Sequence, residues 1–265
     1  MLDAHPHVSL QRAKGRAMAA FGGGDNRLRD LHQSGSLKAL LPKNHAPVPD
    51  LVLVNTAGGL TGGDRYAVNV TAHDGASVTV ATQTAERVYK ASTGVAHMDV
   101  TLSVSGGGAL HWLPQETILF DHSAIQRTIT ANVDESSRLL IVEPVVFGRQ
   151  AMGETLTQTH FSDRWRIRQN GRLIHAEQTR ISGDFAAYQG IGALNGARAV
   201  ATILYVGPDA VDLLEAVRSY GIQASAWDGR MVIRLMDESP RNLRLQITDF
   251  MKKFRGCDLP RVWTM

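Results

Sequence analysis

Three similar segments, spaced about 30 residues apart, constrain the fold of this chain most strongly. AVNVTAHDGASVTVAT (67–82), DVTLSVSGGGALHWLP (99–114) and TITANVDESSRLLIVE (128–143) each read as strand, polar or glycine-containing turn, strand. Each is followed by a short stretch that carries an apolar–aromatic pair, at 83–90, 115–121 and 144–150. This spacing is typical of repeats that stack as layers, although three unrelated hairpins would give the same pattern. Both alternatives predict a β-rich region.

The flanking segments extend this prediction to the whole chain. Alternating apolar residues around Gln169-Asn170-Gly171 predict a hairpin over 161–182, so the β-rich region covers 51–182. Residues 1–50 form an N-terminal segment whose first residues we expect to be mobile, and 183–196 form a connecting loop. The predicted fold is predominantly β, with stacked β-hairpin repeats or layered sheets and a β-solenoid among the possible arrangements.

The C-terminal portion, 197–265, reads as strand, helix, two strands and helix, which is α+β in class and packs on the β region. The predicted elements are a strand over 197–206, a helix from Pro208-Asp209 to Tyr220, and strands over 223–227 and 231–236 around Asp228-Gly229. The last helix begins at Ser239-Pro240 and has one apolar stripe. Its other face carries Arg241, Arg244, Lys252 and Lys253, interpreted as a solvated surface or a contact for an acidic partner. The whole chain should contain two to three helices.

NTAGGLTGGDRY (55–66) is dense in glycine but does not match a phosphate-binding loop. Asp64 occupies the position where such a loop has its lysine, and a carboxylate there would repel phosphate. The residues from Tyr66 to Val70 alternate with the period of a strand, not of a helix. The segment is therefore predicted to be a bend between strands 51–54 and 66–70.

Composition excludes several classes of protein. The 43% hydrophobic content suits a globular core, and a net charge of +3 leaves no strong footprint for a nucleic-acid partner. The single cysteine, Cys257, fits a reducing compartment, and the first residues do not resemble a secretory signal. No apolar run approaches the roughly 20 residues of a membrane span. These observations predict a cytoplasmic protein without a membrane partner.

Recognisable catalytic and metal-binding motifs are missing from the sequence. It has no H-E-x-x-H, no paired cysteines for zinc and no G-x-S-x-G elbow. The histidines are dispersed, and the one close pair, His5 and His7, would bind a divalent ion only weakly. The sequence alone identifies no metal ligand.

Acidic residues are the one group of polar side chains that recurs at similar places, next to the third strands of the repeats. They are Glu86, Glu116, Asp121, Glu143 and Glu154. Carboxylates along a channel could pass a divalent cation from site to site. Ion pairing with Arg87, Arg127 and Arg149 would explain the same acids. A third alternative is a carbohydrate-active enzyme with Glu116 and Asp121 as its acids, although residues five apart on a strand point to opposite faces. A generic protein-interaction module is a fourth.

Five segments resemble the urease accessory protein D family: NTAGGLTGGDRY (55–66), TQTAERVYKAS (82–92), LPQETILFD (113–121), FGRQAMGE (147–154) and LPRVWTM (259–265). The resemblance covers the chain from about Val52 onward. It implies a predominantly β, non-catalytic maturation factor. Its partners would be the accessory protein F, the accessory GTPase G and apo-urease. Nickel(II) would pass through in transit, with no cofactor permanently bound.

The same resemblance implies where function would lie. The candidate residues for the nickel route or a partner interface are Asp64, Arg65, Glu86, Glu116, Asp121, Glu143, Arg149 and Glu154. Asp64 is expected either to line the route or to fix the bend through Arg65.

Overall fold

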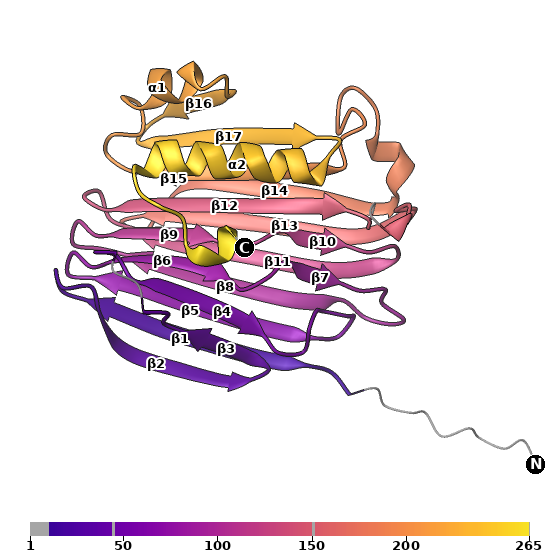
Figure 1. The fold of residues 1–265 in the computed structure, drawn as a ribbon, viewed down its shortest axis with the longest axis horizontal. Helices are drawn as coiled ribbons and strands as arrows, with labels where there is room; N and C mark the ends of the chain where they lie inside the picture. Colours follow the sequence, from indigo (N-terminus) through magenta and orange to yellow (C-terminus); the bar gives the residue numbers. More distant parts are fainter. Residues whose placement is uncertain (1–10, 44–45, 150–151, 265) are drawn as a thin grey trace, which may run out of the picture.

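The computed structural model describes residues 11–43, 46–149 and 152–264 (Figure 1). The expectations for the first residues, including the pair His5 and His7, lie outside this range. Within it, the chain folds into two β-sheets that face each other, and both α-helices lie in the C-terminal portion. The predicted class, predominantly β with a solenoid-like stacking and two α-helices, is confirmed.

The seven-stranded sheet has the order β14-β13-β11-β8-β5-β1-β2. Its strands in chain order are β1 (Lys14–Gly22), β2 (Arg27–Gly35), β5 (Arg65–His73), β8 (Ala96–Val104), β11 (Ser123–Val133), β13 (Gln158–Gln169) and β14 (Arg172–Asp184). Strands β1, β5, β8, β11 and β13 run parallel to their neighbours in this series, and the strands at the two edges pair antiparallel.

The ten-stranded sheet has the order β16-β17-β15-β12-β9-β6-β4-β3, with two short strands beside this path. Its strands are β3 (Leu37–Leu40), β4 (Asp50–Asn55), β6 (Ser77–Thr82), β7 (Glu86–Val88), β9 (Ala109–Leu113), β10 (Thr117–Leu119), β12 (Arg138–Phe147), β15 (Ala199–Val206), β16 (Ala224–Trp227) and β17 (Arg230–Asp237). Strands β4, β6, β9 and β12 are parallel, and β7 and β10 form a short parallel pair that joins β12.

The three repeats stack as layers of a β-solenoid. Strands β5 and β6, which follow each other in the chain, lie in different sheets, and each pairs with the equivalent strand of the next layer. The hairpin interpretation of these segments is therefore wrong, and the layered one is confirmed. At Asp74-Gly75, where both residues have positive φ (55° and 80°), the turn carries the chain from one sheet to the other. Figure 1 shows the layers rising from the indigo strands at one end to the orange strands at the other.

Sequence reasoning missed or misplaced several elements. Residues 14–40 form three strands that were not predicted. Strand β2 is exposed along almost its whole length and shows no alternation, whereas β1 does alternate and was overlooked. The stretch 144–147 is not a separate strand but continues β12. The predicted hairpin around Asn170-Gly171 forms as β13 and β14.

The C-terminal portion continues the ten-stranded sheet, because β15 pairs with β12. Helix α1 (Leu214–Ser219) is shorter than predicted: Asp209 accepts a hydrogen bond from the Tyr205 hydroxyl at 2.7 Å, and turns occupy the residues before Leu214. Helix α2 (Pro240–Arg255) begins after Ser239, whose hydroxyl accepts from the Asn242 N–H, and ends at Gly256 with φ 60°. Two short 3-10 helices, η2 (Phe185–Tyr188) and η3 (Arg261–Trp263), complete the described structure.

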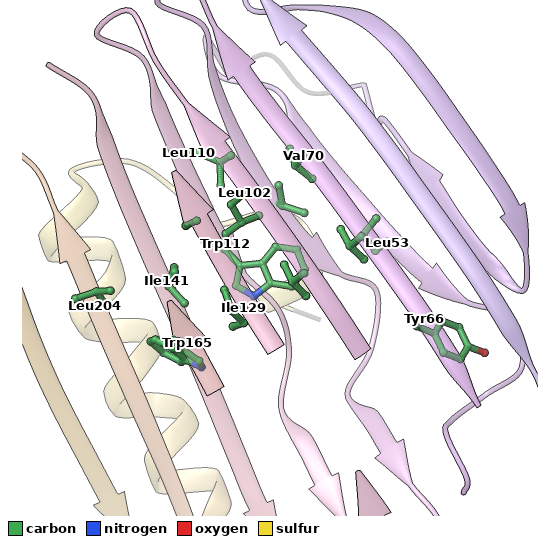
Figure 2. Packing of buried hydrophobic residues seen from close by; sticks show 14 of the residues in the cluster. Leu53, Tyr66, Val70, Leu102, Leu110, Trp112, Ile129, Ile141, Trp165 and Leu204 are labelled. Atoms are coloured by element: carbon green, nitrogen blue, oxygen red, sulfur yellow. The ribbon is translucent and has the colours of Figure 1, made fainter. Parts of the chain in front are cut away.

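Two apolar cores hold these layers together. The larger lies between the two sheets and includes Tyr66, Trp112 and Trp165 (Figure 2). The smaller lies on the outer face of the ten-stranded sheet, where α2 and the C-terminal tail cover it with Ile247, Phe250 and Trp263. Burial of these side chains is the main stabilising contribution to the fold.

Candidate functional site

The glycine-rich segment 55–66 connects β4 in one sheet to β5 in the other. Gly58, Gly59 and Gly63 have φ of 78°, 154° and 92°, values that side-chain-bearing residues rarely adopt. Gly62 is required for another reason, because a Cβ there would lie 2.2 Å from the Thr93 carbonyl oxygen. The segment is a bend between strands, as predicted.

Asp64 fixes this bend through the backbone and not through Arg65. Its carboxylate, which is buried, accepts hydrogen bonds from the N–H groups of Ala13 and Thr61, both at 2.8 Å. Arg65 begins β5, is exposed, and its N–H donates to the Ala13 carbonyl. Asp64 therefore ties the start of the chain's first strand to the glycine-rich bend.

Glu86, on β7, belongs to a chain of hydrogen bonds at the interior edge of the bend. Both of its oxygens accept from Asn55 Nδ2, at 3.1 and 3.3 Å. The Oδ1 atom of Asn55 accepts from the Tyr66 hydroxyl at 2.9 Å, and that hydroxyl lies 2.7 Å from the hydroxyl of Ser36. We call these four residues the Glu86 cluster. Asn55, Tyr66 and Glu86 line a cavity of about 60 Å³, enough for a few water molecules.

The charge state of Glu86 depends strongly on its surroundings. Burial, with a smaller contribution from the negative charge of Asp64, raises the pKa of Glu86 from 4.5 to about 7, against the opposing effect of the Asn55 hydrogen bond. Burial also raises the pKa of Tyr66. The Glu86 carboxyl therefore gains and loses its proton near neutral pH, and a bound cation could take the place of that proton.

A second buried cluster centres on Arg127, which replaces an apolar residue on the inward face of β11 between Ile125 and Ile129. Its guanidinium donates to both oxygens of Asp163, at 3.0 and 2.6 Å, and to Glu143. Glu143 also accepts from Trp112 Nε1 at 2.7 Å, and Arg127 donates to Thr117 at 3.2 Å. We call these five residues the Arg127 cluster.

The Arg127 cluster contains one cation and two carboxyl groups, all nearly inaccessible to solvent. Burial raises the pKa of Glu143; Arg127 opposes this rise and the charge of Asp163 adds to it. Burial alone would lower the pKa of Arg127, but Asp163 and Glu143 raise it above its ordinary value. With both acids ionised the cluster has a net charge of −1, which a buried environment disfavours unless a proton or a cation compensates it.

The strand register places the two clusters on one line along the axis of the solenoid. Tyr66 pairs with Met98, Met98 with Arg127, and Arg127 with Asp163. On the short strands Glu86 pairs with Thr117, which Arg127 contacts. Because neighbouring strands lie about 4.8 Å apart, the line from Tyr66 to Asp163 spans roughly 14 Å.

Polar groups continue beyond this line towards the C-terminal edge of the sheets. Glu177 on β14 accepts from Arg234 Nη2 on β17 at 2.5 Å, which joins the two sheets. In the described residues, the buried nitrogens Trp165 Nε1, His175 Nε2 and Arg230 Nε have no hydrogen-bond partner. Burial lowers the pKa of His175, with smaller contributions from Arg230 and Arg234, against the opposing negative charge of Glu177. Within the described chain, no group of three or more His, Cys, Asp or Glu residues could form a complete metal site.

Glu116 is oriented away from the interior, towards α2. Arg244 of α2 donates to its carboxylate at 2.8 and 3.0 Å, and also to Gln115 and to the Trp263 carbonyl. The interpretation of Arg244 as a solvated residue was wrong, because this arginine connects α2 and the tail to the segment before β10.

Asp121, Arg149 and Glu154 gather on the surface near the ends of β7 and β10. Arg149 and Glu154 form an ion pair at 2.9 Å, and the Arg149 guanidinium lies 4.1 Å from the centre of the Phe120 ring. Asp121 accepts from the N–H groups of Thr157 and Gln158 at 2.7 and 3.0 Å, and these bonds lower its pKa although partial burial opposes them. With Tyr89 these residues border an open hollow of about 440 Å³. Asp121 and Glu116 thus serve different contacts and do not act as one pair of acids.

Sequence reasoning selected Asp64, Glu86 and Glu143 of the interior groups but did not select Asn55, Tyr66 or Asp163 as site residues. One signal was available: Asp163 lies between Phe161 and Trp165, at an inward position of an alternating strand. Arg127 was considered only as an ion-pair partner, although it occupies the same kind of position. A charged residue in an apolar alternation is a mark of a buried polar cluster.

Comparison with known proteins covers nearly the whole chain. The family model described as "UreD urease accessory protein" matches residues 11–264. A urease accessory protein UreD of Agrobacterium fabrum is 42% identical over 99% of this chain and 95% of its own length. One of Rhizobium leguminosarum bv. trifolii is 44% identical over 100% of both chains. No helix in the described residues has the length and apolar character needed to cross a membrane. The chain therefore belongs to the UreD family of urease accessory proteins.

Proposed function

We propose that this chain is a non-catalytic urease maturation factor. It links apo-urease to the accessory protein F and the accessory GTPase G, and it helps to conduct nickel(II) into the urease active site. The observation that carries the proposal is the family match, which runs from residue 11 to residue 264. The protein acts in the cytoplasm and binds no cofactor permanently.

The interior polar line supports the nickel part of this proposal. Nickel(II) is the transported substrate, and it needs oxygen or nitrogen ligands that hold it without completing its coordination. Glu86 and Glu143 supply single carboxylates, each with a raised pKa, so each can exchange a proton for a cation near neutral pH. Glu86 on β7 and Glu143 on β12 lie two layers apart, with β10 between their strands, an arrangement that suits transfer along the axis of the solenoid.

The remaining candidate residues take different roles in the proposal. Asp64 is a positioning residue, because backbone N–H groups already occupy both its oxygens. Glu116 holds α2 in place through Arg244. Asp121, Arg149 and Glu154, together with the partly exposed Tyr89, form a partner interface, since aromatic and arginine side chains are enriched at such contacts. Arg65, exposed at the start of β5, is assigned to the same class of interface residue.

The test is urease activation in cells that express apo-urease, the F and G proteins and a nickel supply, with and without this chain. We expect activity only when the chain is present. Equal activity in its absence would refute the maturation role. Copurification of the chain with the F protein and with apo-urease would test the scaffold role separately.

A further inference from the structure

A large hollow on the described surface contains none of the candidate residues. It has a volume of about 870 Å³ and is bordered by residues 42–43 and 46–48, by the end of α2 and by the tail at 257–264. The apolar side chains of Val48, Val52, Leu259 and Val262 line it, and we refer to them as its floor. We call it the tail groove.

Basic side chains surround the tail groove. Lys43, Lys252 and Arg261 are exposed at its rim, and in the described part of the chain none of the three side chains forms an ion pair or hydrogen bond. With Arg255 the groove has four cations against two acids, Asp50 and Asp258, which leaves a net charge of +2. An excess of unpaired positive charge over an apolar floor is complementary to an acidic, partly apolar partner.

Arg255 is fixed in place and anchors one side of the groove. Its Nε donates to His111 Nδ1 and its Nη2 to Thr79 Oγ1, both at 3.0 Å, and its Nη1 donates to the Asp258 carbonyl at 3.1 Å. Burial lowers the pKa of His111 to about 3, so this histidine stays neutral and keeps accepting the bond at any ordinary pH. The groove therefore has a rigid basic wall and an accessible basic rim.

We propose that the tail groove binds an acidic peptide segment of a partner protein, with carboxylates on Lys43, Lys252 and Arg261 and apolar side chains on the floor. A small metabolite would need convergent buried polar groups, whereas the cations here are mostly on the rim. A nucleic acid would need a wider basic face without the two acids. This inference goes beyond nickel delivery, and its test does not depend on urease activation.

The single cysteine gives a local reporter of occupancy. Cys257 is exposed and lines the groove, so a bound segment should cover it. The probe is a fluorescein-labelled synthetic peptide of alternating glutamate and leucine, titrated against the purified full-length chain by fluorescence anisotropy. The rate of Cys257 alkylation is measured at each peptide concentration. We expect saturable binding that slows alkylation in proportion to occupancy.

Matched variants separate the groove from general charge attraction. The double variant Lys43→Glu/Arg261→Glu should raise the Kd by about tenfold or more. The control Arg241→Glu/Lys253→Glu, which makes the same change of charge on exposed residues of α2 outside the groove, should leave it within about twofold. Circular dichroism and thermal unfolding check that both variants are folded.

Three results would overturn the proposal. One is the absence of saturable binding, or binding that leaves the alkylation of Cys257 unchanged. Another is an equal loss of affinity in the two double variants, or equal affinity for a glutamine–leucine peptide. The third is displacement of the peptide by citrate that itself protects Cys257, which would make the groove a small-carboxylate site.

Discussion

Replacing Glu86 with glutamine should change how the stability of the protein depends on pH. The pKa of Glu86 is raised from 4.5 to about 7 in the folded state, mainly by burial. Between these two values the unfolded chain releases this proton while the folded chain keeps it, so stability falls as pH rises. Each pKa unit corresponds to about 1.4 kcal/mol, so the ionised residue costs about 3 kcal/mol above pH 7. Glu86→Gln removes this cost and keeps the acceptor for Asn55.

The assay is chemical denaturation of wild type and Glu86→Gln from about pH 4.5 to pH 8. We expect similar stability at the acidic end, and a variant that is more stable by about 2 to 3 kcal/mol at the alkaline end. The control is Glu154→Gln. Its partner Arg149 lowers the pKa of Glu154, so that residue's contribution is present above its ordinary pKa and is lost as pH falls. A difference between Glu86→Gln and wild type that is constant over this range would refute the reasoning.

Three further perturbations test individual contacts by thermal unfolding. Arg127→Met leaves Glu143 and Asp163 buried without a cation, so it should lower the free energy of unfolding by about 3 to 5 kcal/mol. A smaller loss than that of Glu143→Gln would contradict the role of Arg127 as the cation of this cluster. Asp64→Ala leaves two backbone N–H groups without acceptors and should cost about 2 to 4 kcal/mol, with faster hydrogen exchange at Ala13; unchanged exchange would argue against the clamp. Gly62→Ala should cost about 1 to 3 kcal/mol through its clash with the Thr93 carbonyl, whereas Gly24→Ala, which meets nothing within 4 Å, should be neutral. Equal effects of the two glycine substitutions would show that the bend has room for a side chain.

Local signals predicted much of the fold. The pair Ser239-Pro240 predicted the observed start of the last helix, because a capping residue acts through adjacent backbone groups. Asn170-Gly171 and Asp228-Gly229 likewise formed the predicted antiparallel hairpins. The spacing of the repeats favoured layers over hairpins, but local sequence could not decide between the two arrangements. Whether an Asp-Gly turn returns the chain to its own sheet or sends it to the opposite one depends on where the next layer lies.

The candidate site could be predicted only in part, because burial depends on layers that are distant in sequence. Glu86 and Glu116 belong to successive repeats, but the strand register pairs Glu86 with Thr117, so Glu116 is one position out of step and pairs instead with Arg244 of α2, about 130 residues away. This offset appears only when the strands are paired. Strand β2 escaped prediction for the opposite reason: it lies at an edge, is exposed on both faces and has no alternation to detect.

The central claim is that nickel reaches urease through the polar interior of this chain. The most direct measurement is the nickel content of urease matured with purified accessory proteins and with wild type, Glu143→Gln or the surface control Glu154→Gln, after the variants are shown to be folded and to copurify with their partners. The account predicts several-fold less nickel with Glu143→Gln and an unchanged amount with Glu154→Gln. Equal nickel content in all three would contradict conduction through the interior.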